Sequence, residues 1–297
     1  MAATTEKHRR TLPSLLPLVF FSGLILCSSV FLCGCYTLSE AAAGGLLHPV
    51  RHYVNAPAPQ DCTESRIQGE GVTLAGWRCR ATGKRRGALV YLHGIADNRA
   101  SARGIIQRYT ARGLDVLAYD SRAHGESGGD TCTYGFFERH DLRRIIDSIA
   151  PGLVILFGTS LGAAVALQEA ADDPRVTAIV AAEVFSDLRT VARERAPFFL
   201  SHGTINKAFE VAEREGRFTV DAVSPVNAAS RLSIPVLLIH GAEDRDTPPA
   251  HSKRVFAALN APKRLILVPH AGHNQSLSGD VWNQIDEWIE QVFSERR

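Results

Sequence analysis

The sequence has little net charge. Its formal charge is +2, and residues 1–35 account for this surplus, because they hold three basic side chains against one acidic side chain. The remaining residues carry equal numbers of the two kinds and show no concentrated basic stripe. Since nucleic acids are bound through such stripes, we expect no nucleic-acid partner.

Cysteine is also scarce. Six Cys in 297 residues are too few for a disulfide scaffold, and none lies in a C-x-x-C pair typical of a zinc site. With 45% apolar and 22% charged residues, the composition excludes disordered, collagen-like and multi-span membrane proteins. No metal or organic cofactor is implied, and Cys132 is expected to be a buried apolar filler.

One long apolar stretch stands out at residues 12–32, behind a basic head at residues 7–10. This layout is typical of a secretory signal. The stretch ends in Leu-Cys-Gly-Cys at residues 32–35, which resembles the lipobox of bacterial lipoproteins. The resemblance implies cleavage before Cys35 and acylation of its sulfur, and two or more acyl chains anchor a protein stably.

A retained transmembrane helix remains the alternative, because residues 12–32 would rise about 31 Å and span a bilayer. Complete release of the protein is a third possibility. In the first two cases the basic end stays in the cytoplasm and the bulk of the chain is exported, so we expect an extracytoplasmic place in a bacterial cell envelope. Residues 1–35 are then a signal or anchor, residues 36–60 a tether, and residues 61–297 the folded domain.

The domain begins with a predicted hairpin of residues 61–68 and 72–81. A two-residue turn at residues 70–71 would place Cys62 directly opposite Cys79. Opposed residues hold their Cβ atoms about 4.5–5.5 Å apart, close to disulfide range, and an oxidising compartment preserves such bonds. We therefore predict a Cys62–Cys79 disulfide, with two buried thiols as the alternative.

From residue 88 onward, apolar runs of strand length alternate with segments of helix length. The expected strands are residues 88–92, 115–119, 153–157, 176–182, 234–239 and 264–268, and the expected helices are 101–111, 136–149, 161–171, 250–259 and 281–293. Continuous apolar runs mark strands buried on both faces. The alternation predicts an α/β fold, with a mostly parallel central sheet, helices on both faces and the hairpin at one edge.

Residues 184–231 interrupt this rhythm. They are rich in charge, with Pro-Phe-Phe-Leu at residues 197–200. An insertion between two strands is typical of a lid over the carboxyl edge of the sheet, where open α/β sheets bind ligands. The apolar cluster would either line an apolar pocket or belong to a helix packed on the body.

The strongest motif is Gly-Thr-Ser-Leu-Gly at residues 158–162, which follows an expected strand and opens an expected helix. In that context G-x-S-x-G indicates a sharp turn that carries a nucleophilic Ser. The turn is so tight that the residues two positions before and after the Ser are Gly, and it leaves the Ser oxygen exposed. The Leu161 amide at the helix N-terminus favours negative charge beside Ser160. A Ser nucleophile needs a base, and the base needs an orienting acid.

Two later loops supply both groups, each directly after an expected strand. Asp244 lies in the first loop and His273 in the second, so the order is Ser, Asp, His. Asp246 is an alternative acid, or it caps the following helix, and His270 is an alternative base.

Two further motifs bring the number to five, and all five fall in order at five strand ends. From about residue 61 the chain therefore resembles an α/β-hydrolase. The other resemblances are His-Gly at residues 93–94 to the oxyanion loop, residues 120–127 to D-x-R-x-x-G-x-S, and residues 241–248 and 272–273 to the acid and base loops. The resemblance implies Ser160 as nucleophile, His273 as base and Asp244 as acid, with the backbone amides of Ile95 and Leu161 as the oxyanion hole.

Other polar residues near these loops are expected to have structural roles. Asp120 and Arg122 would brace their loop, Glu243 would face solvent, and the histidines His93, His124 and His240 would be hydrogen-bonded near the sheet edge.

These inferences predict a membrane-anchored, extracytoplasmic serine hydrolase that cleaves a small-molecule or lipid carboxylic ester through an acyl-enzyme. The alternatives are a serine peptidase or amidase of the same fold and a non-catalytic binding protein. A Ser at the elbow argues against the dehalogenase, epoxide hydrolase and dienelactone hydrolase branches. The sequence indicates neither the acyl-chain length nor the oligomeric state.

Overall fold

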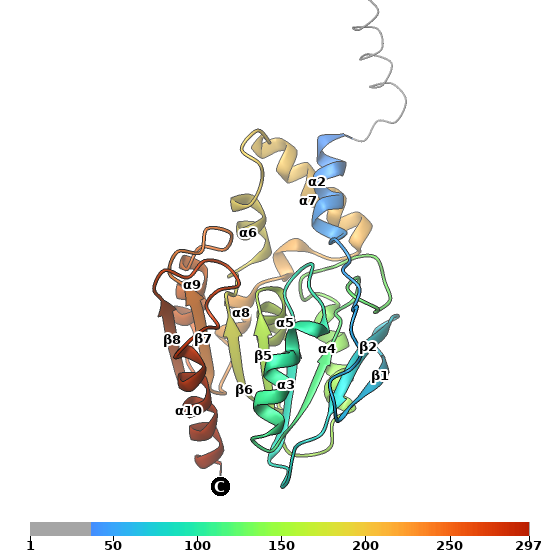
Figure 1. Ribbon diagram of the computed structural model, residues 1–297. Coiled ribbons are helices and arrows are strands. Elements are labelled where there is room, and N and C mark those ends of the chain that lie inside the picture. Colours follow the sequence, from blue (N-terminus) through green and yellow to red (C-terminus); the bar gives the residue numbers. More distant parts are fainter. Residues whose placement is uncertain (1–36, 297) are drawn as a thin grey trace, which may run out of the picture. The chain divides into compact units, whose positions relative to one another are not determined.

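The computed structural model describes residues 37–296 (Figure 1). In chain order the elements are α2 (Leu38–Leu47), β1 (Cys62–Gln68), β2 (Thr73–Cys79), β3 (Gly87–Leu92), η1 (Arg99–Ala102), α3 (Arg103–Thr110), β4 (Leu114–Tyr119), α4 (Glu138–Asp147), β5 (Leu153–Thr159), α5 (Leu161–Ala170), β6 (Val176–Ala182), α6 (Leu188–Glu194), α7 (His202–Gly216), η2 (Val220–Ala222), α8 (Pro225–Ala229), β7 (Val236–Gly241), α9 (Ala250–Ala258), β8 (Lys263–Val268) and α10 (Val281–Ser294).

The strands form one eight-stranded sheet in the order β1-β2-β4-β3-β5-β6-β7-β8. β1 pairs antiparallel with β2, and β2 pairs antiparallel with β4, whereas the pairs from β4 to β8 are all parallel. The predicted fold class, with its antiparallel hairpin at one edge, is confirmed. The carboxyl ends of the parallel strands meet at one edge, where the predicted catalytic loops begin.

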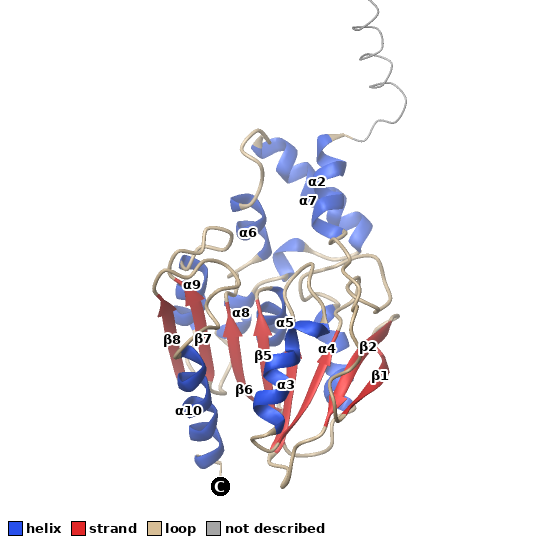
Figure 2. Ribbon diagram, viewed as in Figure 1, coloured by secondary structure: helices blue, strands red, loops and turns tan. Residues whose placement is uncertain are grey.

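Helices lie on both faces of the sheet (Figure 2), and an apolar cluster fills the space on each face. Successive residues of β3 point to opposite layers: Leu89 and Tyr91 face the side covered by α3 and α10, while Val90 and Leu92 face the side covered by α4, α5 and α9. All six residues of β3 are buried, as expected for a strand covered on both faces. This two-sided burial makes the sheet a rigid base for the loops at its edge.

The hairpin of β1 and β2 has the predicted register. Ile67 lies opposite Leu74, and Cys62 lies opposite Cys79. The two cysteines form a disulfide with their Cα atoms 4.1 Å apart. Cys132 is a buried free thiol in the apolar core.

Residues between β6 and β7 form α6 and α7, which lie above the carboxyl edge of the sheet, and then η2 and α8, of which α8 packs against α5 and α9 (Figure 1). Within the Pro-Phe-Phe-Leu segment that joins α6 to α7, the Phe198 side chain is 99% exposed. Phe199 is 66% exposed, and together with Pro197 and Leu200 it lines the rim of an apolar cavity. The segment is therefore a cavity wall and not a helix packed on the body.

The expected tether requires a correction. Residues 38–47 form the helix α2, which packs against α7 and buries Ala43 and Leu47. Close approach is possible because α7 ends at Gly216, where an added Cβ would lie 2.9 Å from the Leu47 side chain. Tertiary packing thus outweighs the low complexity of this Ala- and Gly-rich segment.

The chain after α2 is also fastened to the domain. The Arg51 guanidinium donates hydrogen bonds to the carbonyl oxygens of Ser127 and Gly129, at 2.6 and 2.5 Å. The predicted lipidation site, Cys35, lies outside the described residues. Among residues 37–296, no helix has the length and apolar character to cross a membrane.

Candidate active site

Ser160 occupies a sharp turn between β5 and α5. Its backbone has φ 49° and ψ −110°, a strained conformation for a residue with a side chain. A Cβ on Gly158 would lie 2.4 Å from the Gly162 backbone, and a Cβ on Gly162 would lie 2.1 Å from the Leu92 carbonyl oxygen. Both glycines are therefore required by space, as the motif predicts.

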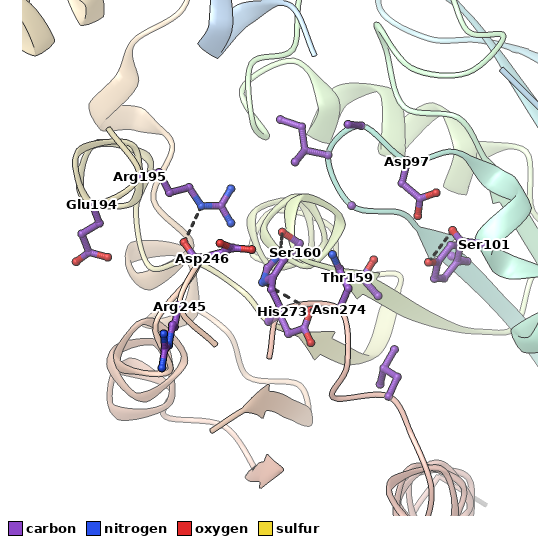
Figure 3. Close-up of a pocket in the computed structure, with 16 residues that line it drawn as sticks. Asp97, Ser101, Thr159, Ser160, Glu194, Arg195, Arg245, Asp246, His273 and Asn274 are labelled. Atoms are coloured by element: carbon purple, nitrogen blue, oxygen red, sulfur yellow. Dashed lines mark hydrogen bonds and ion pairs between the residues drawn. The ribbon is translucent and has the colours of Figure 1, made fainter. Parts of the chain in front are cut away.

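The structure brings the three predicted catalytic side chains together, and Figure 3 shows two of them, Ser160 and His273, facing each other. His273 Nε2 lies 3.2 Å from Ser160 Oγ, and His273 Nδ1 lies 2.7 Å from Asp244 Oδ2. The His273 side chain is 10% exposed and that of Asp244 is buried, so bulk water is largely excluded from this chain of hydrogen bonds. The arrangement can carry a proton from the hydroxyl to the imidazole and stabilise the resulting charge.

The two alternative residues make their hydrogen bonds elsewhere, and the chain from Ser160 runs through His273 to Asp244. His270 is 90% exposed and its Nδ1 pairs with the exposed Glu243 carboxylate at 2.8 Å. Asp246 is exposed, and its backbone amide donates to Asp244 Oδ1 at 2.9 Å. Asp246 thus helps to orient the acid through its main chain.

Asp244 is held by a full set of donors. Its Oδ1 also accepts the Thr247 amide at 2.8 Å, and its Oδ2 lies 3.2 Å from His240 Nε2. Burial favours a higher pKa for Asp244, but hydrogen bonds from His240, His273 and the Thr247 amide outweigh burial and hold the pKa well below its usual range. Asp244 is therefore an anion facing His273.

His240 contributes to this environment more directly than the sequence suggests. Its Nδ1 lies 2.6 Å from Ser252 Oγ, and its Nε2 lies 2.7 Å from the Thr247 carbonyl oxygen. Because a carbonyl only accepts, Nε2 carries a proton, and that proton also faces Asp244. The residue was expected only as a structural histidine near the sheet edge.

Sequence reasoning missed Glu183, which directly follows β6. Its carboxylate is buried and accepts the backbone amides of Asn274 and Ser276, at 2.6 and 3.2 Å. Its Oε2 lies 3.8 Å from His273 Nδ1, so a second carboxylate holds the loop that carries His273. Its position at the carboxyl end of a buried strand, shared with the other site residues, is the signal that could have indicated it.

The predicted oxyanion loop lies against the nucleophile. A Cβ on Gly94 would be 3.6 Å from the Ser160 Cβ, and Ile95 lines the cavity beside Ser160. Leu161 is the first residue of α5, so its amide belongs to the unpaired first turn of a helix. Ile95 and Leu161 therefore flank Ser160 from two different elements.

His93 fixes the start of this loop. Its Nδ1 lies 2.6 Å from the Gly94 carbonyl oxygen, and its Nε2 accepts the Ser121 amide at 2.9 Å. This pattern defines a neutral imidazole that joins the loops after β3 and β4. The expected structural role agrees with these contacts.

The loop after β4 is braced as expected. Asp120 is fully buried and pairs with the buried Arg99, and the Arg122 guanidinium contacts both oxygens of Asp141. The buried His124 places Nδ1 2.8 Å from the Arg122 carbonyl oxygen. Burial, together with the nearby His93, lowers the pKa of His124 to about 4.

A cavity of about 760 Å³ opens beside Ser160. Its walls include Asp97 and Ser101 on one side and Arg195, Arg245 and Asp246 on the other (Figure 3). This size lies within the usual range for small-molecule sites. The polar walls lie around Ser160.

Glu183, Asp244 and His273 also place one potential metal-ligand atom each within 4.8 Å of one another. In His273, however, Nδ1 bonds to Asp244 and Nε2 faces Ser160. Two of the three groups are thus already engaged in the hydrogen-bond chain, and the set fits a catalytic triad supported by an extra carboxylate.

Comparison with known families agrees with this geometry. Residues 89–285, more than half of the chain, match the model of the alpha/beta hydrolase family. The chain belongs to this family. The match begins in β3 and ends in α10, so it spans every loop that carries a site residue of this hydrolase.

Individual relatives share between 24% and 28% of their residues with this chain. The hydrolase is 28% identical over 198 residues to the uncharacterized protein YqkD of Bacillus subtilis, which covers 63% of this chain and 65% of YqkD. It is 27% identical over 230 residues to YfhR of Escherichia coli K12, covering 72% of this chain and 75% of YfhR. Alpha/beta hydrolase domain-containing protein 17B of Xenopus laevis is 24% identical over 184 residues, covering 60% of this chain and 57% of that protein.

Solved structures share the fold. The esterase Pf2001 of Pyrococcus furiosus superposes with a TM-score of 0.64 at 24% identity, covering 83% of this chain and 97% of the esterase. Mouse alpha/beta hydrolase domain-containing protein 10 superposes with a TM-score of 0.60 at 23% identity, covering 77% and 99%. At such identities the likeness establishes the architecture, and the chemistry has to be argued from the residues of this chain.

Proposed function

We propose that this hydrolase cleaves carboxylic esters with Ser160 as nucleophile, His273 as general base and Asp244 as the orienting acid. The supporting observation is the continuous hydrogen-bond chain from Ser160 Oγ through His273 to Asp244, at 3.2 and 2.7 Å, at the wall of a cavity. A binding protein has no need for a strained Ser turn and an ionised Asp behind a buried imidazole. Strain of this kind is retained where it serves catalysis.

The reaction proceeds in two halves. His273 Nε2 takes the hydroxyl proton as Ser160 Oγ attacks the ester carbonyl carbon, and the amides of Ile95 and Leu161 stabilise the oxyanion. The imidazolium then returns the proton to the departing alcohol, which leaves an acyl-enzyme. Water attacks the acyl carbon with His273 again as base, and release of the carboxylic acid restores Ser160.

Labelling with a fluorophosphonate probe tests the nucleophile. The wild-type protein is expected to be labelled and to hydrolyse p-nitrophenyl butyrate, and Ser160→Ala should lose both properties. Thr159→Ser, a conservative change one residue earlier, serves as the control for folding of the turn. Unchanged labelling of Ser160→Ala would contradict the assignment.

The substrate class is tested with matched amides. We expect cleavage of p-nitrophenyl butyrate at least 100-fold faster than that of the corresponding p-nitroanilide, because the amide nitrogen is a poorer leaving group. Comparable rates would instead identify a peptidase or amidase that uses the same residues.

We also propose that residues 1–35 direct export and that lipid on Cys35 anchors the protein to a bacterial membrane. The apolar stretch at residues 12–32, the basic head and the Leu-Cys-Gly-Cys sequence support this. Cys35→Ser should release the protein from the membrane fraction. Continued membrane binding of that variant would favour a retained helix.

A further inference from the structure

A second cavity of about 560 Å³ adjoins the catalytic one. Its walls come from three helices that cover the carboxyl edge of the sheet: α2, α6 and α7 (Figure 1). Ala42 and Leu46 contribute from α2, Val191 from α6, and Ile205 and Phe209 from α7. Its lining is almost entirely apolar, in contrast to the polar walls around Ser160.

Two lining residues, Tyr134 and Arg195, carry polar side-chain atoms, and both hydrogen-bond to other parts of the protein. The Tyr134 hydroxyl donates to the Leu46 carbonyl oxygen at 3.0 Å. Arg195 donates from Nε to the Asp246 carbonyl oxygen at 2.8 Å and from Nη2 to Thr247 Oγ1 at 2.5 Å. The guanidinium therefore turns to the loop after β7, and its hydrocarbon stem remains for the cavity (Figure 3).

The two cavities meet at Ile95 and Arg195, which line both. Ile95 is also the residue whose amide is assigned to the oxyanion hole. A substrate chain that runs from Ser160 Oγ along Ile95 and the Arg195 stem would therefore enter the apolar cavity.

We propose that this second cavity binds the acyl chain of the substrate, so that the enzyme acts on esters of long, unbranched fatty acids. The inference rests on the ester hydrolysis proposed above and names its substrate class. With mostly hydrocarbon on its walls, the cavity suits an apolar chain. Each additional buried methylene is expected to raise kcat/KM by up to about fourfold until the cavity is filled.

Helix α2 offers a matched pair of variants. Gly45 lines the cavity, whereas its neighbour Gly44 does not. At both positions an added Cβ would have no heavy atom within 4 Å, and replacing a helical Gly raises helix propensity equally. Gly45→Phe thus places a ring at the cavity, and Gly44→Phe places the same ring elsewhere on the same helix.

The experiment measures kcat/KM for 4-methylumbelliferyl esters from acetate to decanoate, with the full chain in phosphatidylcholine vesicles. The ratio of decanoate to acetate should fall at least tenfold in Gly45→Phe and stay within twofold of wild type in Gly44→Phe. Ala42→Phe, one turn away on the same face, should repeat the Gly45→Phe result. Because partition into vesicles is common to all variants, it cancels in the comparison.

An unchanged ratio in both Gly45→Phe and Ala42→Phe, or an equal fall in Gly44→Phe, would overturn the proposal while leaving ester hydrolysis in place. If the wild type cleaves no ester, displacement of 11-(dansylamino)undecanoate tests the cavity by itself. Binding that is lost in Gly45→Phe and kept in Gly44→Phe would then support the cavity and reject the proposed reaction. Absence of binding to the wild type would reject the cavity as well.

Discussion

The hydrogen bonds around Asp244 predict a specific failure in the Asp244→Asn variant. In the native site Oδ1 accepts two backbone amides, from Asp246 and Thr247, at 2.9 and 2.8 Å. An Asn side chain has one acceptor oxygen, and these two fixed donors hold it in the Oδ1 position. The NH₂ group of Asn must then face His273 Nδ1.

That orientation changes the tautomer of the His273 imidazole. A donor opposite Nδ1 forces Nδ1 to accept, so the single proton of neutral His273 moves to Nε2, which faces Ser160. The base can no longer remove the hydroxyl proton. In serine triads this wrong tautomer typically lowers kcat about 10⁴-fold, or roughly 5 kcal/mol of transition-state stabilisation.

The assay is hydrolysis of p-nitrophenyl butyrate by wild type, Asp244→Asn and Asp246→Asn. Asp246→Asn should lose less than tenfold, because Asp246 acts on the triad through its backbone amide. Thermal melting should show that both variants are folded. A loss below tenfold in Asp244→Asn, or the larger loss in Asp246→Asn, would refute the tautomer argument.

Three further predictions concern stability. Gly162→Ala should lower the free energy of unfolding by at least about 1–3 kcal/mol, measured in urea, because its Cβ would meet the Leu92 carbonyl oxygen at 2.1 Å; wild-type stability would show that the turn can relax. The pKa of His124 is lowered to about 4 in the folded protein, whereas in the unfolded chain it is near 6.5. Below pH 6.5 the unfolded chain therefore binds a proton that the folded protein does not, and the free energy of unfolding decreases as the pH is lowered. Urea unfolding should therefore show a loss between pH 7 and pH 5 that is about 2 kcal/mol larger in wild type than in His124→Gln, and equal losses would exclude a neutral buried His124. Replacing Cys62 and Cys79 by Ala opens a loop with a sequence separation of 17 and should cost about 3 kcal/mol in the same assay, whereas no loss would mean that the bond leaves the unfolded chain unconstrained.

Much of this architecture could be predicted from local pattern. Buried strands appear as apolar runs, and loops that follow them meet at one edge of a parallel sheet, so Ser160, Asp244 and His273 could be placed together before any coordinates existed. The hairpin register followed from turn length alone, and it brought Cys62 opposite Cys79.

What escaped prediction depends on long-range packing. The helix α2 is stabilised by burying Ala43 and Leu47 against α7. No sequence pattern near residues 38–47 indicates that α7 packs there. In the sequence, Glu183 is one of many acidic residues at the start of a loop. Its role depends on the loop after β8, whose backbone amides at Asn274 and Ser276 donate to its carboxylate. His240 likewise acquires its contact with Asp244 from the turn that follows β7.

Helix α2 also bears on how the catalytic domain is produced for study. Trimming the chain at residue 60, where a tether would end, would strip one side from the apolar cavity and expose the α7 surface that Leu47 covers. The shortened protein would keep Ser160, Asp244 and His273, but if the apolar cavity binds the acyl chain as proposed, it would report the wrong preference for chain length. Cutting instead between residues 35 and 38 would retain the helix and this wall of the cavity.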